Sequence, residues 1–515
     1  IPRAEQAQFS ADSRFAAFAI KPFYKDIRQA KIKKTKAEEM TKDSLGIANL
    51  STLAVQKIER VKSFKFPENG AFLAYQLEKP LDTVRKTSAD TAMKASDLIV
   101  RNLNTGTERT FKYVQEYHFS KDGKLLAFAS APPKNDKSSP AGAFLLDTEK
   151  GTVKTLVGGP GSFKSFTFDE ESELLAFLGE KSPEKAPIKD YFVYYNSLSL
   201  DTAQILVDNA IPGMPSKWAV SGDGTLTFSK DGKKLFFGIA PVKKPKDTTL
   251  VDFEHAKLDI WSYKDDYLQP MQLKNAEKES KRSYLTAIEI FNADVKIVPL
   301  SDSNIPDATL IAEGDSEYVL ASTDFGNRIQ SQWTAGSVRD YYLTDTRNGS
   351  KKKIISGLSG YASPSPAGKY VLYFDKKTSN WYTYTIASGK VTHLNDGLSV
   401  KLVDELNDVP DDPSSYGLTA WTEDDKSVLL YDRYDIWEFS PDGKSAPRNI
   451  TNGNGRQNGL TFRYMQVDPE QKYLTKREDI WPTAFNNNTK ENGFYKTSVG
   501  NTKDPELVVM AKAKY

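Results

Sequence analysis

The sequence predicts an all-β protein, a β-propeller built from four-stranded blades, and three observations lead to this prediction. One hairpin pattern recurs along the whole chain. A second hairpin follows each copy of the first. No helical segments alternate with the strands in the way that a parallel sheet would require.

The recurring first hairpin is clearest in the stretch FSKDGKLLAFAS (Phe119 to Ser130), which returns as FSKDGKKLFFGI (Phe228 to Ile239). In such a turn glycine supplies the positive φ and aspartate caps the backbone, so the pattern joins two adjacent strands. Seven further copies, some of them weaker, bring the total to nine; they begin at Phe9, Phe66, Phe168, Ala312, Pro364, Trp421 and Val467.

The turn position of these copies carries mostly small or turn-tolerant residues, as that geometry requires. Only the last of them fits poorly. The nine residues are Ser13, Gly70, Gly123, Ser172, Gly232, Ser316, Gly368, Asp425 and Gln471.

A second hairpin, with a β-rich run before a polar turn, follows each first hairpin. Two hairpins make four strands in about 50 to 60 residues, which is typical of a propeller blade. The nine second hairpins begin at Asp43, Asp97, Ala143, Phe192, Leu258, Asp340, Trp381, Tyr434 and Phe494.

Packing explains why such units associate. A lone four-stranded sheet leaves both of its faces exposed to water, whereas blades stacked face to face bury these faces. The alternative is a β-sandwich or a stack of barrels, which nine ordered copies make less favourable. We expect residues 1–515 to form a propeller repeat region with seven to nine blades in its main ring. One large propeller, two modules, and repeats outside the ring all remain open.

Two connections look least like blades, and loops carry function more often than scaffolds do. The interval between the copies at Phe228 and Ala312 is the longest, and its excess, residues 274–300, is an insertion long enough for a short helix. The other connection, DELNDVPDDPSSYGL (Asp404 to Leu418), is rich in acid and proline.

Composition excludes several classes of function. Lys and Arg number 70 against 68 Asp and Glu, so the net charge of +2 indicates no nucleic-acid partner, and no apolar run is long enough for a membrane span. The basic stretch from Lys25 to Met40 is interpreted as a solvated insertion. With no cysteine and three scattered histidines, we expect neither disulfides nor a histidine-rich metal centre.

No catalytic motif is present. The strings nearest to the Gly-x-Ser-x-Gly nucleophile turn, GDSEY at Gly314 and GLSGY at Gly357, both lack the second glycine in place. Phosphate-binding glycine loops are also missing. We therefore expect this chain to hold no catalytic residue, cofactor or metal.

Two acidic features are candidates for binding. Asp404, Glu405, Asp408, Asp411 and Asp412 offer oxygen ligands for calcium, but they lack EF-hand order, so a rigid acidic turn fixed by prolines is favoured. In YDRYDIW (Tyr431 to Trp437), Arg433 can pair with a carboxylate, and a structural salt bridge is the favoured interpretation. The substrate-contact candidates are Arg433, Asp408, Asp411 and Asp412.

Three longer stretches carry a resemblance to a known family: KLDIWSYKDD (Lys257 to Asp266), WTEDDKSVLLYDRYDIWEFSPDGK (Trp421 to Lys444) and FRYMQVDPEQKYL (Phe462 to Leu474). Together with the serial FSKDGK hairpins, they resemble the N-terminal propeller of bacterial prolyl oligopeptidase-family serine peptidases. The similarity is greatest to exported members of the dipeptidyl aminopeptidase-like and acylaminoacyl-peptidase-like kinds.

The resemblance implies a propeller over the mouth of a C-terminal α/β-hydrolase domain, which carries Ser, Asp and His and admits short peptides. No position here matches those catalytic residues, so the expected partners are a hydrolase domain outside this sequence and a peptide substrate. It also implies a periplasmic or otherwise exported protein whose signal peptide is not in this sequence. Family propellers commonly have seven or eight blades, fewer than the nine repeats.

The sequence therefore supports a non-catalytic propeller that gates and selects peptides for a serine peptidase. The alternative is a stand-alone propeller that binds protein or glycan. An enzyme acting in the central channel without a triad is disfavoured, because no cluster of titratable groups can be located.

Overall fold

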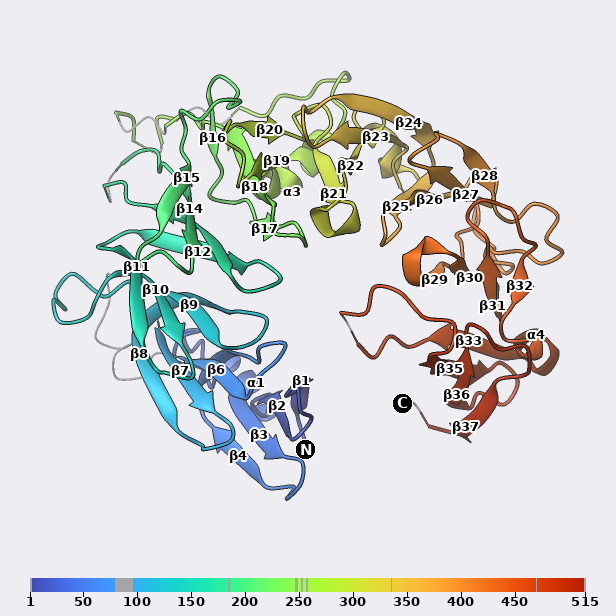
Figure 1. The fold of residues 1–515 in the computed structure, drawn as a ribbon, viewed down its shortest axis with the longest axis horizontal. Helices are drawn as coiled ribbons and strands as arrows, with labels where there is room; N and C mark the ends of the chain where they lie inside the picture. The colour runs from blue at the N-terminus through green and yellow to red at the C-terminus, as the bar shows by residue number, and fades with distance from the viewer. Residues whose placement is uncertain are drawn as a thin grey trace. The chain divides into compact units, whose positions relative to one another are not determined.

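The computed structural model describes residues 2–78, 96–183, 186–245, 249–251, 253–255, 258–334, 336–468 and 470–513. Lys257 and Pro469, which belong to two of the stretches that carry the family resemblance, lie outside these ranges. Figure 1 shows the described chain as a succession of small sheets in chain order.

Four antiparallel sheets form from the first part of the chain. The first has the order β1-β2-β3-β4 and contains β1 (Ala4–Phe9), β2 (Phe15–Ile20), β3 (Ser44–Asn49) and β4 (Val55–Ile58). The second has the order β11-β10-β9-β8-β7-β6-β5 and contains β5 (Val61–Lys65), β6 (Phe72–Leu77), β7 (Ser96–Asn102), β8 (Glu108–Phe119), β9 (Leu125–Ser130), β10 (Gly142–Asp147) and β11 (Val153–Gly158). The third has the order β12-β13-β14-β15 and contains β12 (Ser162–Phe168), β13 (Leu174–Glu180), β14 (Phe192–Ser197) and β15 (Gln204–Val207). The fourth has the order β16-β18-β19-β20, with β17 also paired to β18, and contains β16 (Trp218–Val220), β17 (Thr227–Phe228), β18 (Lys234–Pro241), β19 (Tyr284–Glu289) and β20 (Ile297–Pro299).

Four more sheets follow along the chain. The fifth has the order β21-β22-β23-β24 and contains β21 (Asp307–Leu310), β22 (Tyr318–Thr323), β23 (Arg339–Asp345) and β24 (Lys351–Leu358). The sixth has the order β25-β26-β27-β28 and contains β25 (Gly360–Pro364), β26 (Tyr370–Asp375), β27 (Asn380–Thr385) and β28 (Val391–His393). The seventh has the order β29-β30-β31-β32 and contains β29 (Leu418–Trp421), β30 (Val428–Tyr431), β31 (Ile436–Phe439) and β32 (Arg448–Asn449). The eighth contains β33 (Leu460–Tyr464), β34 (Asp479–Ile480), β35 (Pro482–Asn486), β36 (Asn492–Ser498) and β37 (Glu506–Ala511).

The long strand β8 explains why the second sheet has seven strands. Its first half pairs with β7 and its second half with β9, with a register shift between Val114 and Glu116. β8 thus ends one four-stranded unit and begins the next. Counted this way, the described residues contain nine antiparallel units, of which seven have four strands and two, the fourth and the eighth sheets, have five. The fold is all-β and of the β-propeller class, as the sequence predicts.

Helices are few in the described chain. They are α1 (Tyr24–Ile32), α3 (Gln269–Ser280), α4 (Asn454–Asn458) and the 3-10 turns η1 (Ala312–Gly314), η2 (Arg328–Gln332) and η3 (Glu423–Asp425). The basic helix α1 buries none of its residues. Among the described residues, no helix is long and apolar enough to cross a membrane.

Alternating strand residues bury both faces of the sheets. On β6, Leu73 and Tyr75 pack against the first sheet, whereas Ala74 packs toward the β9 and β10 side. On β30, Leu430 packs against the sixth sheet and Leu429 against the eighth. Because successive side chains of a strand point to opposite faces, an unbroken apolar run is what a strand covered on both sides requires.

The chain divides into two compact units. One comprises Ile1–Val251 and Ile288–Ile297, and the other comprises Asp252–Ala287 and Val298–Tyr515. Clusters of buried residues join consecutive sheets inside each unit: the first sheet to the second and the second to the third, and, further along, the fifth to the sixth, the sixth to the seventh and the seventh to the eighth.

Hydrogen bonds from its own residues to the Asp122 carboxylate hold the FSKDGK turn. Ser120 Oγ donates to Asp122 Oδ1 at 2.7 Å, and the same carboxylate oxygen accepts from Lys124 N at 3.1 Å. Gly123 has a φ of 71°, and a Cβ there would lie 2.4 Å from Asn69 O. A positive φ also occurs at Ser13, Gly70, Ser172, Gly232, Gly368 and Asp425.

The turn before β26 lacks an aspartate of its own, and the following sheet supplies one. Asp425, which is 2% exposed, accepts from Ser365 Oγ at 2.5 Å, Ala367 N at 3.0 Å and Lys369 N at 3.1 Å. In the FSKDGK turn the aspartate binds residues of its own turn. Asp425 instead binds a turn of the preceding sheet, so its carboxylate connects the sixth and seventh sheets.

Two of the predicted hairpins are wrong. The stretch from Leu258 to Asp266 is not a strand, and its continuation is helix α3; the third and fourth strands of that unit are β19 and β20, within the residues predicted to be an insertion. The helix expected near there does form. At Val467 no hairpin turn forms either, because β33 pairs with β35 across a longer connection. Gln471 accordingly has no positive φ. The hairpin at Ala312 does form, because β21 pairs with β22, but its positive φ angles fall at Ala312, Glu313 and Gly314 and not at the expected Ser316.

Replacing Asp425 by alanine should destabilise the fold markedly. The change leaves three donors of a neighbouring turn without their acceptor in a buried place, for which we expect a loss of roughly 2–4 kcal/mol in the free energy of unfolding. Asp122→Ala, which removes the same carboxylate from a more exposed turn, is the matched control and should lose less. Urea denaturation of both variants measures this, and equal losses would contradict the role of Asp425 between sheets.

His118 should make stability depend on pH. Burial, and secondarily the charge of Lys65, lower the pKa of His118 from 6.5 to about 4. The unfolded chain therefore binds this proton first, and the protein should lose stability as pH falls from about 6.5 to about 4. We expect His118→Phe to lose less stability than the wild type across this window in denaturation at several pH values. Parallel curves for the two proteins would contradict the prediction.

Candidate functional site

The acidic connection between β28 and β29 is a closed loop anchored at both ends. At its base Asp404 N donates to Ser414 O at 2.8 Å, and Asn407 Nδ2 donates across the loop to Asp411 O at 2.8 Å. Asp411 Oδ2 forms an ion pair with Lys376 Nζ at 2.5 Å. This ion pair lowers the pKa of Asp411.

Arg433 lies in the turn between β30 and β31, where it approaches the other end of the acidic loop. Its Nη1 lies 3.9 Å from Glu405 Oε2, while Arg456 Nη2 lies 2.9 Å from Glu405 Oε1 and 3.3 Å from Asp432 Oδ2. The structure thus brings together the two features that the sequence singles out. Glu405 is the residue that joins them.

The two aspartates of this turn have structural roles. Asp432 Oδ1 accepts from Tyr434 N and Asp435 N, both at 2.6 Å. Asp435 accepts from Thr451 Oγ1 at 2.6 Å and from the first N–H groups of α4. Burial raises the pKa of Asp435. These buried carboxylates fix the backbone that presents Arg433.

Arg463 on β33 lies beside this turn. Its guanidinium is 4.6 Å from the ring centre of Tyr431 and 5.6 Å from that of Tyr416. Its Nη2 donates to Arg433 O at 3.4 Å and its Nη1 to Phe462 O at 2.6 Å. Burial lowers the pKa of Arg463.

A cavity of 440 Å³ lies on the other side of the same loop. Its lining combines hydroxyl groups, two aromatic rings and charges of both signs. The residues are Gln330, Thr334, Gly336, Ser337, Val338, Ser359, Gly360, Tyr361, Phe374, Lys376, Lys377, Asp411, Asp412, Ser414, Ser415 and Gly417.

Two of the predicted contact residues, Asp411 and Asp412, line this cavity. Asp408 and Arg433 are not among the described residues that line it. Gly360 has no room for a side chain, since a Cβ would lie 2.0 Å from Phe374 O. Tyr361 Oη and Ser415 Oγ are 2.9 Å apart and tie the acidic loop to β25.

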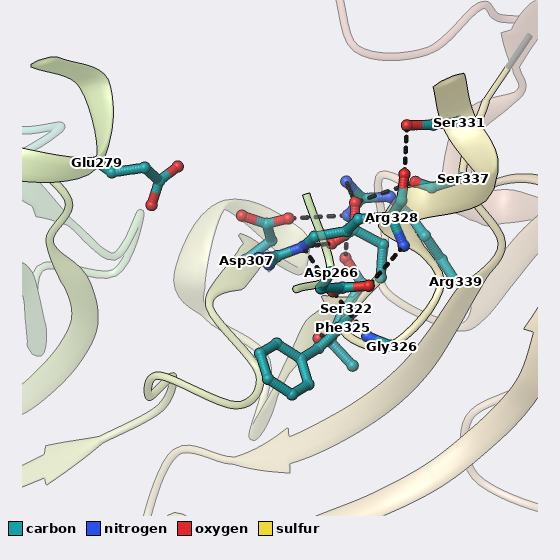
Figure 2. A network of polar contacts seen from close by, with 12 residues as sticks. Asp266, Glu279, Asp307, Ser322, Phe325, Gly326, Arg328, Ser331, Ser337 and Arg339 are labelled. Atoms are coloured by element: carbon teal, nitrogen blue, oxygen red, sulfur yellow. Dashed lines mark hydrogen bonds and ion pairs between the residues drawn. The ribbon is translucent and has the colours of Figure 1, made fainter. Parts of the chain in front are cut away.

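A network of ion pairs and hydrogen bonds lies beside the part of the cavity lining that comes from Gln330, Thr334, Gly336, Ser337 and Val338 (Figure 2). Ser337, which lines the cavity, donates to Asp324 Oδ2 at 3.0 Å, and Arg328 Nε donates to Asp324 Oδ1 at 2.7 Å. Burial alone would raise the pKa of Asp324, but these hydrogen bonds and the charge of Arg339 lower it overall.

Asp266 belongs to the same network and anchors the stretch that was predicted to be a strand. It accepts from Gly326 N at 2.8 Å and from Arg328 N at 3.1 Å (Figure 2). Four large apolar side chains just before it, which a strand would have buried, are exposed: Leu258, Ile260, Trp261 and Tyr263.

Sequence reasoning missed Lys376, Arg456 and Arg463. Aligning the repeat copies places Lys376 of YFDKK opposite Arg433 of LYDRY, so the repeat itself contains the signal for Lys376. Arg456 and Arg463 reach the site only through tertiary packing. Within the part of the chain that the structure describes, no group of three or more His, Cys, Asp or Glu side chains is placed to hold a metal ion.

The solved structures to which this chain is similar share little of its sequence. No family model and no curated protein matches the sequence. Among solved structures, the tricorn protease aligns at a TM-score of 0.34 with 11% identity, covering 76% of this chain and 34% of that one. A prolyl endopeptidase aligns at 0.33 with 12% identity, covering 83% and 54%. The β-propeller domain of the Trilobed protease from Pyrococcus furiosus aligns at 0.26 with 13% identity, covering 87% and 97%.

The Lys376–Asp411 ion pair should hold the acidic loop closed. In the Asp411→Asn variant we expect cleavage by thermolysin near the exposed Leu406 and Val409 to become roughly threefold faster, as loss of a partly exposed ion pair implies. Asp442→Asn, which removes an ion pair with Lys444 in a hairpin turn, is the control. Mass spectrometry of timed digests measures the rates, and equal rates at this loop in both variants would contradict the prediction.

Proposed function

We propose that this chain is the substrate-selecting propeller of a serine peptidase of the prolyl oligopeptidase family, and that catalysis takes place in an α/β-hydrolase domain outside this sequence. The quoted sequence stretches support the family, and the propeller fold is compatible with it.

The observation that carries the proposal is the cavity beside the acidic loop. Its 440 Å³ falls within the range of small-ligand pockets, about 300–1,000 Å³, and is too small for a folded protein. Serine hydroxyls and the ring of Tyr361 suit the amides and side chains of a peptide in an extended conformation.

Charges of both signs support a peptide rather than a neutral sugar as the ligand. Lys377 and Asp412 both line the cavity, and both are exposed. No ion pair of either side chain is found among the described residues. An ammonium and a carboxylate group in one pocket match the two termini, or the charged side chains, of a short peptide.

Peptide binding by the 515-residue chain tests this proposal. We expect unblocked tripeptides to bind in isothermal titration calorimetry, and Lys377→Gln or Asp412→Asn to weaken binding roughly threefold to tenfold, as loss of one charge-assisted contact implies. Lys444→Gln, at a hairpin turn, is the control. Binding of oligosaccharides in preference to peptides would favour the stand-alone glycan-binding alternative.

The same chain should have no peptidase activity of its own. We expect no turnover of aminoacyl-proline chromogenic substrates by the purified 515 residues, whereas a protein that also contains the proposed hydrolase domain should cleave them. Turnover by this chain that survives serine-directed reagents would overturn the assignment of catalysis to another domain.

A further inference from the structure

Two arginine side chains beside the acidic loop have hydrogen-bonding capacity that the described protein does not use. A guanidinium carries five N–H donors. Arg463 directs two of its donors to the main-chain carbonyls of Phe462 and Arg433. The guanidinium of Arg433 makes no hydrogen bond to any described residue, and its one ion pair, with Glu405, is long at 3.9 Å.

The local carboxylates are engaged elsewhere. Arg456 forms ion pairs with both Glu405, at 2.9 Å, and Asp432, at 3.3 Å. Asp432 also holds the N–H groups of its own turn, and Asp435 holds those of α4. Among the described residues, Glu405 is therefore the one carboxylate paired with Arg433, and it is also the closer partner of Arg456.

Of the two arginines, Arg433 and Arg463, it is Arg463 whose surroundings are the less usual for a charged group. It lies partly buried between two tyrosine rings, and no carboxylate of the described residues comes within 4.0 Å of it. The attraction of a cation to tyrosine rings offsets only part of the cost of removing a guanidinium from water. The lowered pKa of Arg463 agrees with this incomplete compensation.

Both guanidinium groups lie near Tyr416: that of Arg463 is 5.6 Å from the ring centre, and the charge of Arg433 acts on the hydroxyl. Arg463 Nη2 donates to the main-chain carbonyl of Arg433, and the Arg433 side chain is 27% exposed. Both rest on rings, Arg433 on Tyr434 at 5.0 Å and Arg463 on Tyr431 at 4.6 Å, so their planes are held before any ligand arrives. Preorganised guanidinium forks match the planar, two-oxygen geometry of a carboxylate.

We infer that Arg433 and Arg463 form a binding site for the carboxylate group of a short peptide ligand. The identity of the ligand rests on the proposed function, but the site has residues of its own, outside the lining of the cavity. Glu405 occupies the approach to Arg433 and competes with the incoming carboxylate.

Calorimetry with the 515-residue chain and matched tripeptides tests the inference. The probes are N-acetyl-Ala-Ala-Ala with a free C-terminus, the same peptide as its C-terminal amide, and N-acetyl-Ala-Glu-Ala-amide, which moves the carboxylate to a side chain. We expect the free acid to bind at least about tenfold more tightly than the all-amide peptide, as a charge-assisted bidentate contact implies. The glutamate peptide reports whether the terminus or a side chain supplies the carboxylate.

The substitutions should change the affinity for the free acid in opposite directions. Arg433→Gln should weaken binding of the free acid about tenfold and leave binding of the amide unchanged, and Arg463→Lys should also weaken it, because a lysine has no planar fork. Glu405→Gln should strengthen binding a fewfold, because it removes the competing carboxylate. Arg347→Gln, a paired arginine on another sheet, is the control.

Thermal unfolding of each variant separates lost contacts from lost folding. Equal affinity for acid and amide, or an Arg433→Gln variant that binds the acid like the wild type, would overturn the carboxylate site while leaving the proposed peptide function standing. Failure of all three peptides, and of the unblocked tripeptides, to bind would overturn both.

Discussion

Sheets in the middle of the series, such as the second, the sixth and the seventh, have buried apolar residues on both faces, and the need to cover both faces at once is the constraint on which the rest of the structure depends. A single sheet with Leu429 on one side and Leu430 on the other cannot be stable in water. Packing against a neighbouring sheet on each side covers both faces. The hairpin turn before β26 lies against the next sheet, to which Asp425 joins it, whereas longer connections form the candidate site.

The site follows from this arrangement because it is built from connections on neighbouring sheets. Lys376 comes from a turn of the sixth sheet, Arg433 from the corresponding turn of the seventh, and the acidic loop runs between these two sheets. Stacking brings equivalent turns side by side, so residues far apart in the sequence meet. Charges of opposite sign at these turns hold the loop across the junction.

The fold could largely be predicted from the sequence because its signal is local and repeated. The pattern around Phe119 places a turn and two strands within a dozen residues, and eight second hairpins were located by the same logic. The hairpin at Leu258 failed because LDIW has the composition of a β31-like strand, whereas YLTAIE from Tyr284 takes that place in the sheet. Composition alone cannot decide between two segments competing for one position.

The site could be predicted only in part. Asp411 and Asp412 were found because acid and proline mark an unusual loop, and Arg433 because a cation stands between aspartates. No local sequence pattern indicates Arg463, because its surroundings depend on the rings of Tyr416 and Tyr431, which come from other elements. Whether Arg433, Asp408, Asp411 or Asp412 contacts a substrate stays a prediction.

The carboxylate of Asp425 also bears on how such a chain can change during evolution. Because it completes a turn that belongs to the preceding sheet, the sixth and seventh sheets depend on each other for a complete set of hydrogen bonds. A duplication or deletion that cuts between them would leave one copy with unsatisfied donors and the other with an unpaired buried charge. We therefore expect these two repeats to be kept together when the chain is rearranged, although each resembles a self-sufficient module.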